Sequence, residues 1–320
     1  MLVRLFLVFV LLAVAAWRFW PGEGFGGLAP LADACGDSAV IAWEPEAPRQ
    51  GALFRVRVSR VPPGAQLSGR AAGEPLHFTA VEGTDSAVVA FAAVPIDGDT
   101  TLSIQVRCAS GERRDTLSAQ LAAARADYPV ERLRVAPSFG RPPDSALAER
   151  IRRESARATE VAVRSHSTPR VWSEPFVFPR EARVTSGFGR GREYNGTITS
   201  RHMGTDFAGA TGAPVLAANR GIVRIVDAFF YGGNVVYLDH GAGLTSAYLH
   251  LSEQLVTQGD TVSRGEVIGR VGATGRVTGP HLHLIVRYGS VTVDPLSLFA
   301  IAGDSAAAAR SGDASSTPER

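Results

Sequence analysis

The stretch TGPHLHLIV at residues 278–286 decides how this chain is interpreted. Its Thr-Gly-Pro opening is typical of a turn, and the apolar run after it indicates a strand. Residues two apart on a strand point to the same face, so His281 and His283 are expected to lie side by side. Two imidazoles on one face can bind one metal ion, or one can bind it while the other handles protons. Taken alone, such a pair is also compatible with a structural role.

Two further patterns carry residues of the same chemistry. In HMGTD at 202–206, His202 and Asp206 are four apart and can reach one metal ion, with Gly204 permitting a sharp backbone path. In YLHLS at 248–252, His250 lies among apolar residues, where a histidine is often only a packing residue. Each pattern is weak by itself, but together they supply the three ligands of a catalytic zinc site and two spare imidazoles.

The chemistry of such a site follows from its charges. Two histidines and one aspartate leave the zinc complex positive, and zinc lowers the pKa of water toward about 7. A spare imidazole can accept the water proton and pass it to a leaving amine. The sequence therefore favours hydrolysis of an amide by a zinc-activated water.

The ordered motifs resemble the lysostaphin-like zinc endopeptidases, the M23 peptidase family. The resemblance covers about Phe178 to Phe299. It is carried by SGFG at 186–189, HMGTDF at 202–207, GAPV at 212–215, GIV at 221–223, YG at 231–232, DHG at 239–241, YLHL at 248–251, GATG at 272–275 and TGPHLH at 278–283.

By this resemblance, His202, Asp206 and His283 correspond to the ligands of one Zn²⁺ per chain. His250 and His281 correspond to the catalytic pair that activates water and stabilises the transition state. The family fold is an antiparallel β-sheet that lines a narrow groove, and its members cut peptide crosslinks of bacterial peptidoglycan.

The remaining candidates have smaller roles. Tyr231 corresponds to a groove tyrosine that contacts the developing oxyanion. His240 is common in the family's turn without being a ligand, so we interpret it as structural. His166 matches no family motif, and His77 is interpreted as an ordinary surface or packing residue.

The implied activity is that of a D,D-endopeptidase acting on D-alanyl bonds to a diamino acid. Cleavage of glycine bridges is disfavoured, since no wall-targeting repeat is visible. The alternative is a non-catalytic or latent regulator that activates other wall hydrolases, but all five chemical positions are present. The arm at 122–180, or the loop from Gly191 to Arg201, is a candidate cover for the groove.

The patterning predicts a mostly β chain. Alternating apolar and polar residues at 52–58, 87–91 and 102–106 predict an immunoglobulin-like β-sandwich, and 145–163 predicts a helix starting after Asp144. The expected organisation is a signal peptide or signal anchor (1–20), a linker (21–34), the sandwich (35–121), an arm with a helix (122–180), the antiparallel β peptidase domain (181–300) and a disordered tail (301–320).

The apolar run at residues 5–17 directs the chain out of the cytoplasm, to the periplasm or beyond. It lies between Arg4 and Arg18, and both a cleaved signal peptide and an inner-membrane anchor stay open. The chain's two cysteines, Cys35 and Cys108, are expected to form a disulfide there. A net charge of +2 gives no electrostatic case for nucleic acid. The expected partner is peptidoglycan, and a protein regulator is left open.

Overall fold

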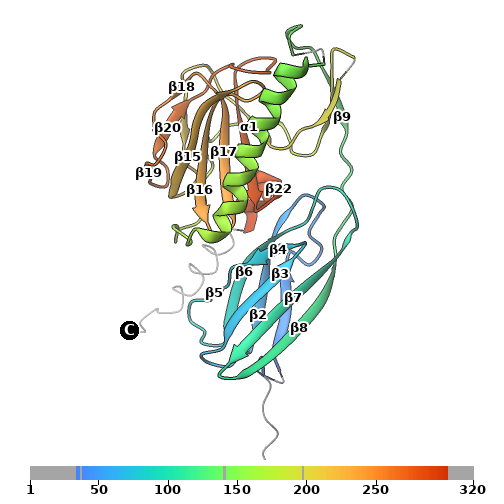
Figure 1. The fold of residues 1–320 in the computed structure, drawn as a ribbon, viewed down its shortest axis with the longest axis vertical. Coiled ribbons are helices and arrows are strands. Elements are labelled where there is room, and N and C mark those ends of the chain that lie inside the picture. Colours follow the sequence, from blue (N-terminus) through green and yellow to red (C-terminus); the bar gives the residue numbers. More distant parts are fainter. Residues whose placement is uncertain (1–33, 37, 140–141, 197, 302–320) are drawn as a thin grey trace, which may run out of the picture. The chain divides into compact units, whose positions relative to one another are not determined.

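The computed structural model describes residues 34–36, 38–139, 142–196 and 198–301 (Figure 1). Strands dominate it, which confirms the prediction of a mostly β chain. The predicted signal or anchor, the linker up to Asp33 and the tail beyond Ile301 lie outside the described residues. Within the described ranges, no helix is both long and apolar enough to cross a membrane.

The N-terminal part consists of two antiparallel sheets that share one apolar core. Their strand orders are β1-β2-β6-β5 and β4-β3-β7-β8. Alternate residues of β2 and β7 are buried, so each sheet turns one face to the core. The immunoglobulin-like relationship itself stays a prediction. The strands are Val40–Glu44 (β1), Leu53–Ser59 (β2), Gln66–Ala71 (β3), Glu74–Leu76 (β4), Thr79–Ala80 (β5), Ala87–Ala93 (β6), Thr101–Ser110 (β7) and Arg113–Ala122 (β8).

The predicted disulfide is present between Cys35 and Cys108. Both cysteines are buried in the core between the two sheets. The bond ties the segment before β1 to β7 across a sequence separation of 73 residues. Closing a loop of this size restricts the unfolded chain by about 4 kcal/mol in the chain-entropy treatment.

The helix α1 (Ser145–Arg164) agrees with the predicted helix to within one residue. Asp144 caps it, because its side chain accepts a hydrogen bond of 2.9 Å from the Leu147 amide. Ala158 and Val161 on one face pack against apolar residues of the C-terminal sheet. A short 3₁₀ turn, η1 (Ser165–Ser167), follows. The helix therefore covers the C-terminal sheet and is more than a connection.

The C-terminal domain is antiparallel β, as predicted for residues 181–300. Its main sheet has the order β10-β13-β21-β17-β16-β15-β19, with β22 paired to β21, and a smaller sheet has the order β14-β20-β18. The strands are Val184–Ser186 (β10), Thr205–Ala208 (β13), Pro214–Leu216 (β14), Gly221–Phe229 (β15), Gly233–Gly241 (β16), Leu244–Leu251 (β17), Glu253–Gln254 (β18), Thr261–Val262 (β19), Val267–Arg270 (β20), His281–Tyr288 (β21) and Val291–Val293 (β22).

The central strand β17 is buried along its whole length, because both faces of the sheet are covered. Tyr248 and Leu251 belong to the main core, whereas Leu249 belongs to a second cluster that α1 packs against. Figure 1 shows α1 running across the face that carries β16 and β17. Burial on both faces gives the site-bearing strands β17 and β21 a fixed frame.

The segment expected as a loop from Gly191 to Arg201 is instead a hairpin of β11 (Gly191–Tyr194) and β12 (Ile198–Arg201). The arm contributes β9 (Val130–Leu133), which pairs in parallel with β11. The expectation of a loop missed the local pairing of β11 with β12, and also the parallel pairing of β11 with β9, a strand that lies about 60 residues earlier. A local pattern does not reveal such a pairing.

His77 and His166, to which the sequence assigned no particular role, are hydrogen-bonded to each other. His77 Nε2 lies 2.9 Å from His166 Nδ1, and His166 Nε2 lies 2.8 Å from a Glu74 carboxylate oxygen. The other Glu74 oxygen accepts from the Ser290 amide at 3.0 Å. These bonds join β4 of the first part to the turn after β21, so the two histidines are more than ordinary surface residues.

Candidate metal centre

His202, Asp206 and His283 lie together, and all three are buried. Each offers one ligand atom, and these atoms lie within 4.8 Å of one another. His202 Nε2 is 3.0 Å from both Asp206 Oδ1 and His283 Nδ1, and Oδ1 is 2.6 Å from that Nδ1. The structure thus brings together the three residues that the sequence predicted as ligands, although their role as ligands stays a prediction.

Strand pairing explains why these residues meet. In the antiparallel pair of β13 and β21, Asp206 lies directly opposite His283. Gly204 leaves room for this approach, since a Cβ atom there would come within 2.7 Å of the His283 Nε2. Gly204 does not have the left-handed backbone that a sharp path would need. The glycine therefore serves close packing, which corrects the reason inferred from sequence.

Hydrogen bonds fix the protonation of this cluster. His202 Nδ1 lies 2.8 Å from the Gly187 carbonyl, which can only accept, so Nδ1 carries the proton and Nε2 is free toward Asp206. Burial raises the pKa of Asp206, but its contacts with His202 and His283 outweigh burial and hold that pKa well below its ordinary range. Burial lowers the pKa of His283 to about 4. The cluster therefore offers the Asp206 carboxylate and a neutral His283 imidazole at neutral pH.

His250 and His281 lie beside this cluster with their rings 4.9 Å apart between centroids. His250 Nδ1 lies 2.9 Å from the Thr274 carbonyl, and His281 Nδ1 lies 2.8 Å from the Gly279 carbonyl. Carbonyl oxygens accept only, so in each ring Nδ1 carries a proton and Nε2 is the nitrogen that can accept one. His281 Nε2 lies 3.6 Å from Asp206 Oδ1. Both rings are thus oriented as proton acceptors.

The backbone at His250 is unusual for a residue in a strand. Its φ of 64° is left-handed, which a non-glycine residue adopts only at a conformational cost. The register between β16 and β17 shifts just there, between the pairs of Asn234 and Val236. Such an irregularity redirects a side chain out of the regular alternation. It explains how Tyr248 and Leu251, three residues apart, both reach the main core.

Arg192 binds the other oxygen of Asp206 and was not predicted from sequence. Its Nη2 donates to Asp206 Oδ2 at 2.7 Å, and its side chain is only 13% exposed. Glu131 of β9 balances this charge, with its Oε2 at 3.7 Å from Arg192 Nε. Ser186 donates to Glu131 and lies 3.2 Å from His202 Nδ1. The hairpin and the arm therefore support two of the predicted ligands from outside.

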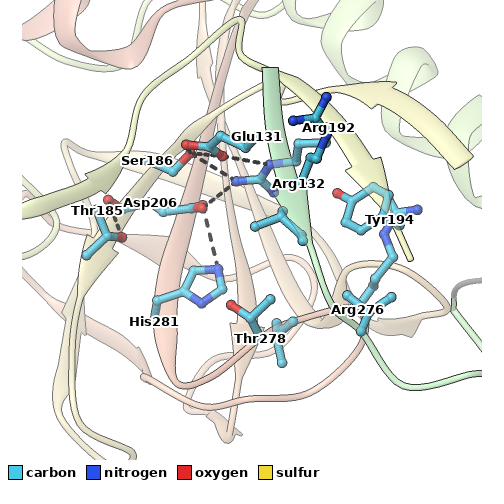
Figure 2. Close-up of a pocket in the computed structure, with 13 residues that line it drawn as sticks. Glu131, Arg132, Thr185, Ser186, Arg192, Tyr194, Asp206, Arg276, Thr278 and His281 are labelled. Carbon is cyan, nitrogen blue, oxygen red and sulfur yellow. Dashed lines mark hydrogen bonds and ion pairs between the residues drawn. The ribbon is translucent and has the colours of Figure 1, made fainter. Parts of the chain in front are cut away.

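A cavity of about 420 Å³ opens at this site. Figure 2 shows Asp206 and His281 at one side of it and Arg276 beside Tyr194 at the other, with the Arg192 guanidinium directed at Asp206. The arm supplies part of the wall, so the cavity does not belong to the predicted peptidase domain alone. The lining residues from the arm are Glu131, Arg132, Leu133 and Val135.

Tyr231, the predicted oxyanion contact, lies against Arg276, whose guanidinium carbon is 4.0 Å from the ring centroid. Its contact with an oxyanion stays a prediction. Sequence reasoning missed Arg192, Glu131 and Arg276. Arg192 could have been noticed as a basic residue in the segment between the SGFG motif at 186–189 and the HMGTDF motif at 202–207. For Glu131 no signal existed, because its strand is attached only through the β9–β11 pairing.

His240, expected to be structural, is completely buried away from the metal cluster. Its Nδ1 donates to the Arg220 carbonyl at 2.7 Å, and its Nε2 lies 2.8 Å from the Ser246 hydroxyl. Burial lowers the pKa of His240 to about 4. The ring is therefore neutral in the folded protein at neutral pH.

This burial predicts a specific loss of stability in mild acid. The unfolded chain binds a proton at a pKa of 6.5, whereas the folded chain binds it at about 4. Stability is full above 6.5 and falls as the pH drops from there to 4, because the unfolded state holds more protons. Between pH 7.5 and pH 5 the free energy of unfolding should fall by about 2 kcal/mol through His240. Urea unfolding of the wild type and His240→Asn at both pH values measures this, and an equally steep fall in the variant would contradict it.

Comparison with known proteins agrees with this geometry. Residues 200–295 match the family model described as Peptidase family M23. A peptidoglycan DD-endopeptidase of Vibrio cholerae serotype O1, ShyB, is 42% identical over 117 residues, which are 36% of this chain and 27% of ShyB. ShyA of the same organism is 47% identical over 110 residues, which are 33% of this chain and 25% of ShyA. The matched segment thus spans about a quarter of these curated relatives.

A solved structure extends the likeness beyond the matched segment. The crystal structure of a protein described as a peptidase M23 from Pseudomonas aeruginosa superposes with a TM-score of 0.61 and 26% identity. It covers 79% of this chain and 95% of that protein. The family match, the fold and the His-Asp-His cluster all agree. The chain therefore carries a domain of peptidase family M23, a family of metallopeptidases.

Proposed function

We propose that the protein is a zinc-dependent endopeptidase that hydrolyses peptide crosslinks of bacterial peptidoglycan. One observation carries the proposal, which is that His202, Asp206 and His283 direct three buried ligand atoms at one point beside the rings of His250 and His281. The M23 match and the DD-endopeptidases among the relatives support it.

The donor set fits zinc. Two imidazole nitrogens and one carboxylate oxygen are its usual ligands in catalytic sites, which keep a fourth position open. Zinc bonds of about 2.0–2.2 Å set tetrahedral ligand atoms roughly 3.3 Å apart. The observed separations of 2.6 to 3.0 Å are somewhat shorter than that value, so the three atoms are near enough to share one ion. His202, Asp206 and His283 would hold the ion, one per chain.

The chain's own groups account for the proton transfers. Bound zinc would supply a Lewis acid that polarises the scissile carbonyl and acidifies water. Burial, followed by the nearby His283 and His281, lowers the pKa of His250 well below its usual value, so its Nε2 can accept a proton at neutral pH. Water oxygen adds to the carbonyl carbon, the C–N bond breaks, and the accepted proton passes to the leaving amine.

The proposed bond joins D-alanine to a diamino acid of the next stem peptide. Relatives named as DD-endopeptidases, and a DD-carboxypeptidase/endopeptidase of Neisseria meningitidis that is 40% identical over 126 residues (39% of this chain and 28% of that protein), support this bond. The disulfide supports an oxidising envelope location. The anchor and a protein regulator stay predictions.

The bond itself can be mapped. Purified protein supplied with zinc should release uncrosslinked stem peptides from intact peptidoglycan, identified by mass spectrometry as cut between D-alanine and the diamino acid. Products cut only in the glycan, or only between sugar and peptide, would contradict the proposed function.

Arg192 provides a prediction within this proposal. Removing the donor that holds Asp206 Oδ2 should loosen a ligand without deleting it, and such support is typically worth 10–100-fold in metal affinity. We expect Arg192→Met to raise the zinc dissociation constant by about that factor in a competition titration with a chromophoric chelator. Arg190→Met is the matched control, since Arg190 also contacts Glu131, at 3.2 Å, without contacting Asp206. Equal affinities for the two variants would refute the role of Arg192.

A further inference from the structure

Arg276 lies at the wall of the cavity, against two aromatic rings. Its guanidinium carbon is 4.0 Å from the ring centroids of both Tyr194 and Tyr231. Its backbone amide donates to the Tyr231 carbonyl at 2.9 Å, which fixes the loop that carries it. Both rings lie within cation–π distance of the guanidinium, and Tyr194 also hydrogen-bonds to it, so only part of its set of N–H donors is occupied.

The charge of Arg276 sets it apart from the other arginines that line the cavity. Arg192 is paired with Asp206 at 2.7 Å, and Arg132 lies 3.5 Å from Glu193. In the part of the chain that the structure describes, no carboxylate forms an ion pair with Arg276. Burial lowers the pKa of Arg276, which reflects the cost of holding a cation there. A partly buried cation without a counter-charge is expensive unless a ligand supplies one.

The position of Arg276 suits a ligand that also reaches the metal cluster. Arg276, Thr278 and His281 line the same cavity, and Figure 2 shows Thr278 between the other two. A peptide with its scissile bond near His281 can therefore extend past Thr278 toward Arg276. Planar, bidentate recognition of a carboxylate is what a guanidinium fork does best.

We propose that Arg276 is a specificity-determining residue that binds a free carboxylate of the stem peptide close to the scissile bond. This inference rests on the proposed function and deepens it. Stem peptides carry free carboxylates on glutamate and on the diamino acid, and both sources present the same chemistry. The contacts with Tyr194 and Tyr231 hold the guanidinium in place before the substrate binds, which reduces the conformational entropy lost on binding.

The test measures binding of the stem-peptide products, which contain no crosslink to cut. Zinc-loaded full-length protein is titrated calorimetrically with the products bearing free carboxylates, and with versions amidated at either the glutamate or the diamino acid. A hydrogen-bonded charge contact is worth about 1.5–3 kcal/mol, so amidating the recognised carboxylate should weaken binding about 10–100-fold. The amidated version that loses affinity identifies the source.

Variants separate recognition from structure. Arg276→Met should bind the free acid more weakly by the same factor, and amidating the product should weaken its binding no further. Arg276→Lys keeps the positive charge but not the planar fork of donors, so its affinity for the free acid should lie between those of the wild type and Arg276→Met. This variant preserves the test if Arg276→Met unfolds. Arg132→Met is the matched control, because Arg132 lines the same cavity but is 83% exposed, and it should bind like the wild type.

Two results would overturn the inference. The first is that amidating the product and Arg276→Met each weaken binding independently, with additive effects. The second is that the wild type does not bind the products, or binds them equally well whether or not they are amidated. Failure of the proposed function would look different, because the wild type would then bind the products but cleave no crosslinks.

Discussion

His283→Ala is expected to remove the bound zinc and to lower crosslink cleavage by several orders of magnitude. His283 supplies one of the three ligand atoms, and its loss leaves His202 and Asp206 with only two of them. A site with two ligands has neither the affinity nor the geometry of the three-ligand centre. Metal content by inductively coupled plasma mass spectrometry and release of stem peptides measure the two effects.

The control for this prediction is another buried histidine of the same sheet. His240→Asn alters a ring that is equally buried but bonded to Arg220 and Ser246, so it should keep zinc and most activity at pH 7.5. Near-ultraviolet circular dichroism must show that both variants are folded. A folded His283→Ala that retains one zinc per chain and cleaves at the wild-type rate would exclude His283 as a ligand.

His250→Ala should have the opposite combination of effects, with zinc retained and cleavage lost. His250 contacts the cluster only through its ring, 5.7 Å from the His283 ring between centroids, and its left-handed backbone aims that ring at the site. Removing a general base typically costs 10²–10⁴-fold in rate. We expect a fall in kcat of that size with the zinc content unchanged.

This variant keeps the strained left-handed backbone and empties a buried position, so its stability needs a separate measurement. His250→Asn is the matched control, because it keeps a polar side chain that tolerates the left-handed backbone but offers no basic nitrogen. Both variants should lose rate by similar factors. Loss of zinc from either one, or a rate near that of the wild type, would contradict the assignment of His250 to proton transfer.

The sequence predicted most of the candidate metal centre because the patterns that carry those residues are local. The pair His281 and His283 needs only the alternation of one strand, and the helix start at Asp144 needs only a capping side chain. The β13–β21 pairing that sets Asp206 opposite His283 has no signal in the local pattern of either strand; the resemblance to the M23 family implied that these positions converge. Local pattern and family motif thus supplied different parts of the prediction.

The features that were missed depend on contacts between distant segments. Glu131 reaches Ser186 and Arg192 only because β9 pairs with β11, and nothing in the residues 122–180 distinguishes that strand from a linker. The left-handed backbone of His250 follows from a register shift that alternation does not predict. Arg276 was missed because its proposed role follows from its neighbours. Among the described residues these are two tyrosine rings and no paired carboxylate, and only a structure reveals them.

Removal and return of the metal test the central claim most directly. The purified chain is stripped with a chelator, assayed on crosslinked peptidoglycan, and titrated with zinc while the released stem peptides are counted. We predict no cleavage without metal, full recovery at one zinc per chain, and cuts between D-alanine and the diamino acid. Cleavage by the stripped protein at the original rate would contradict the account.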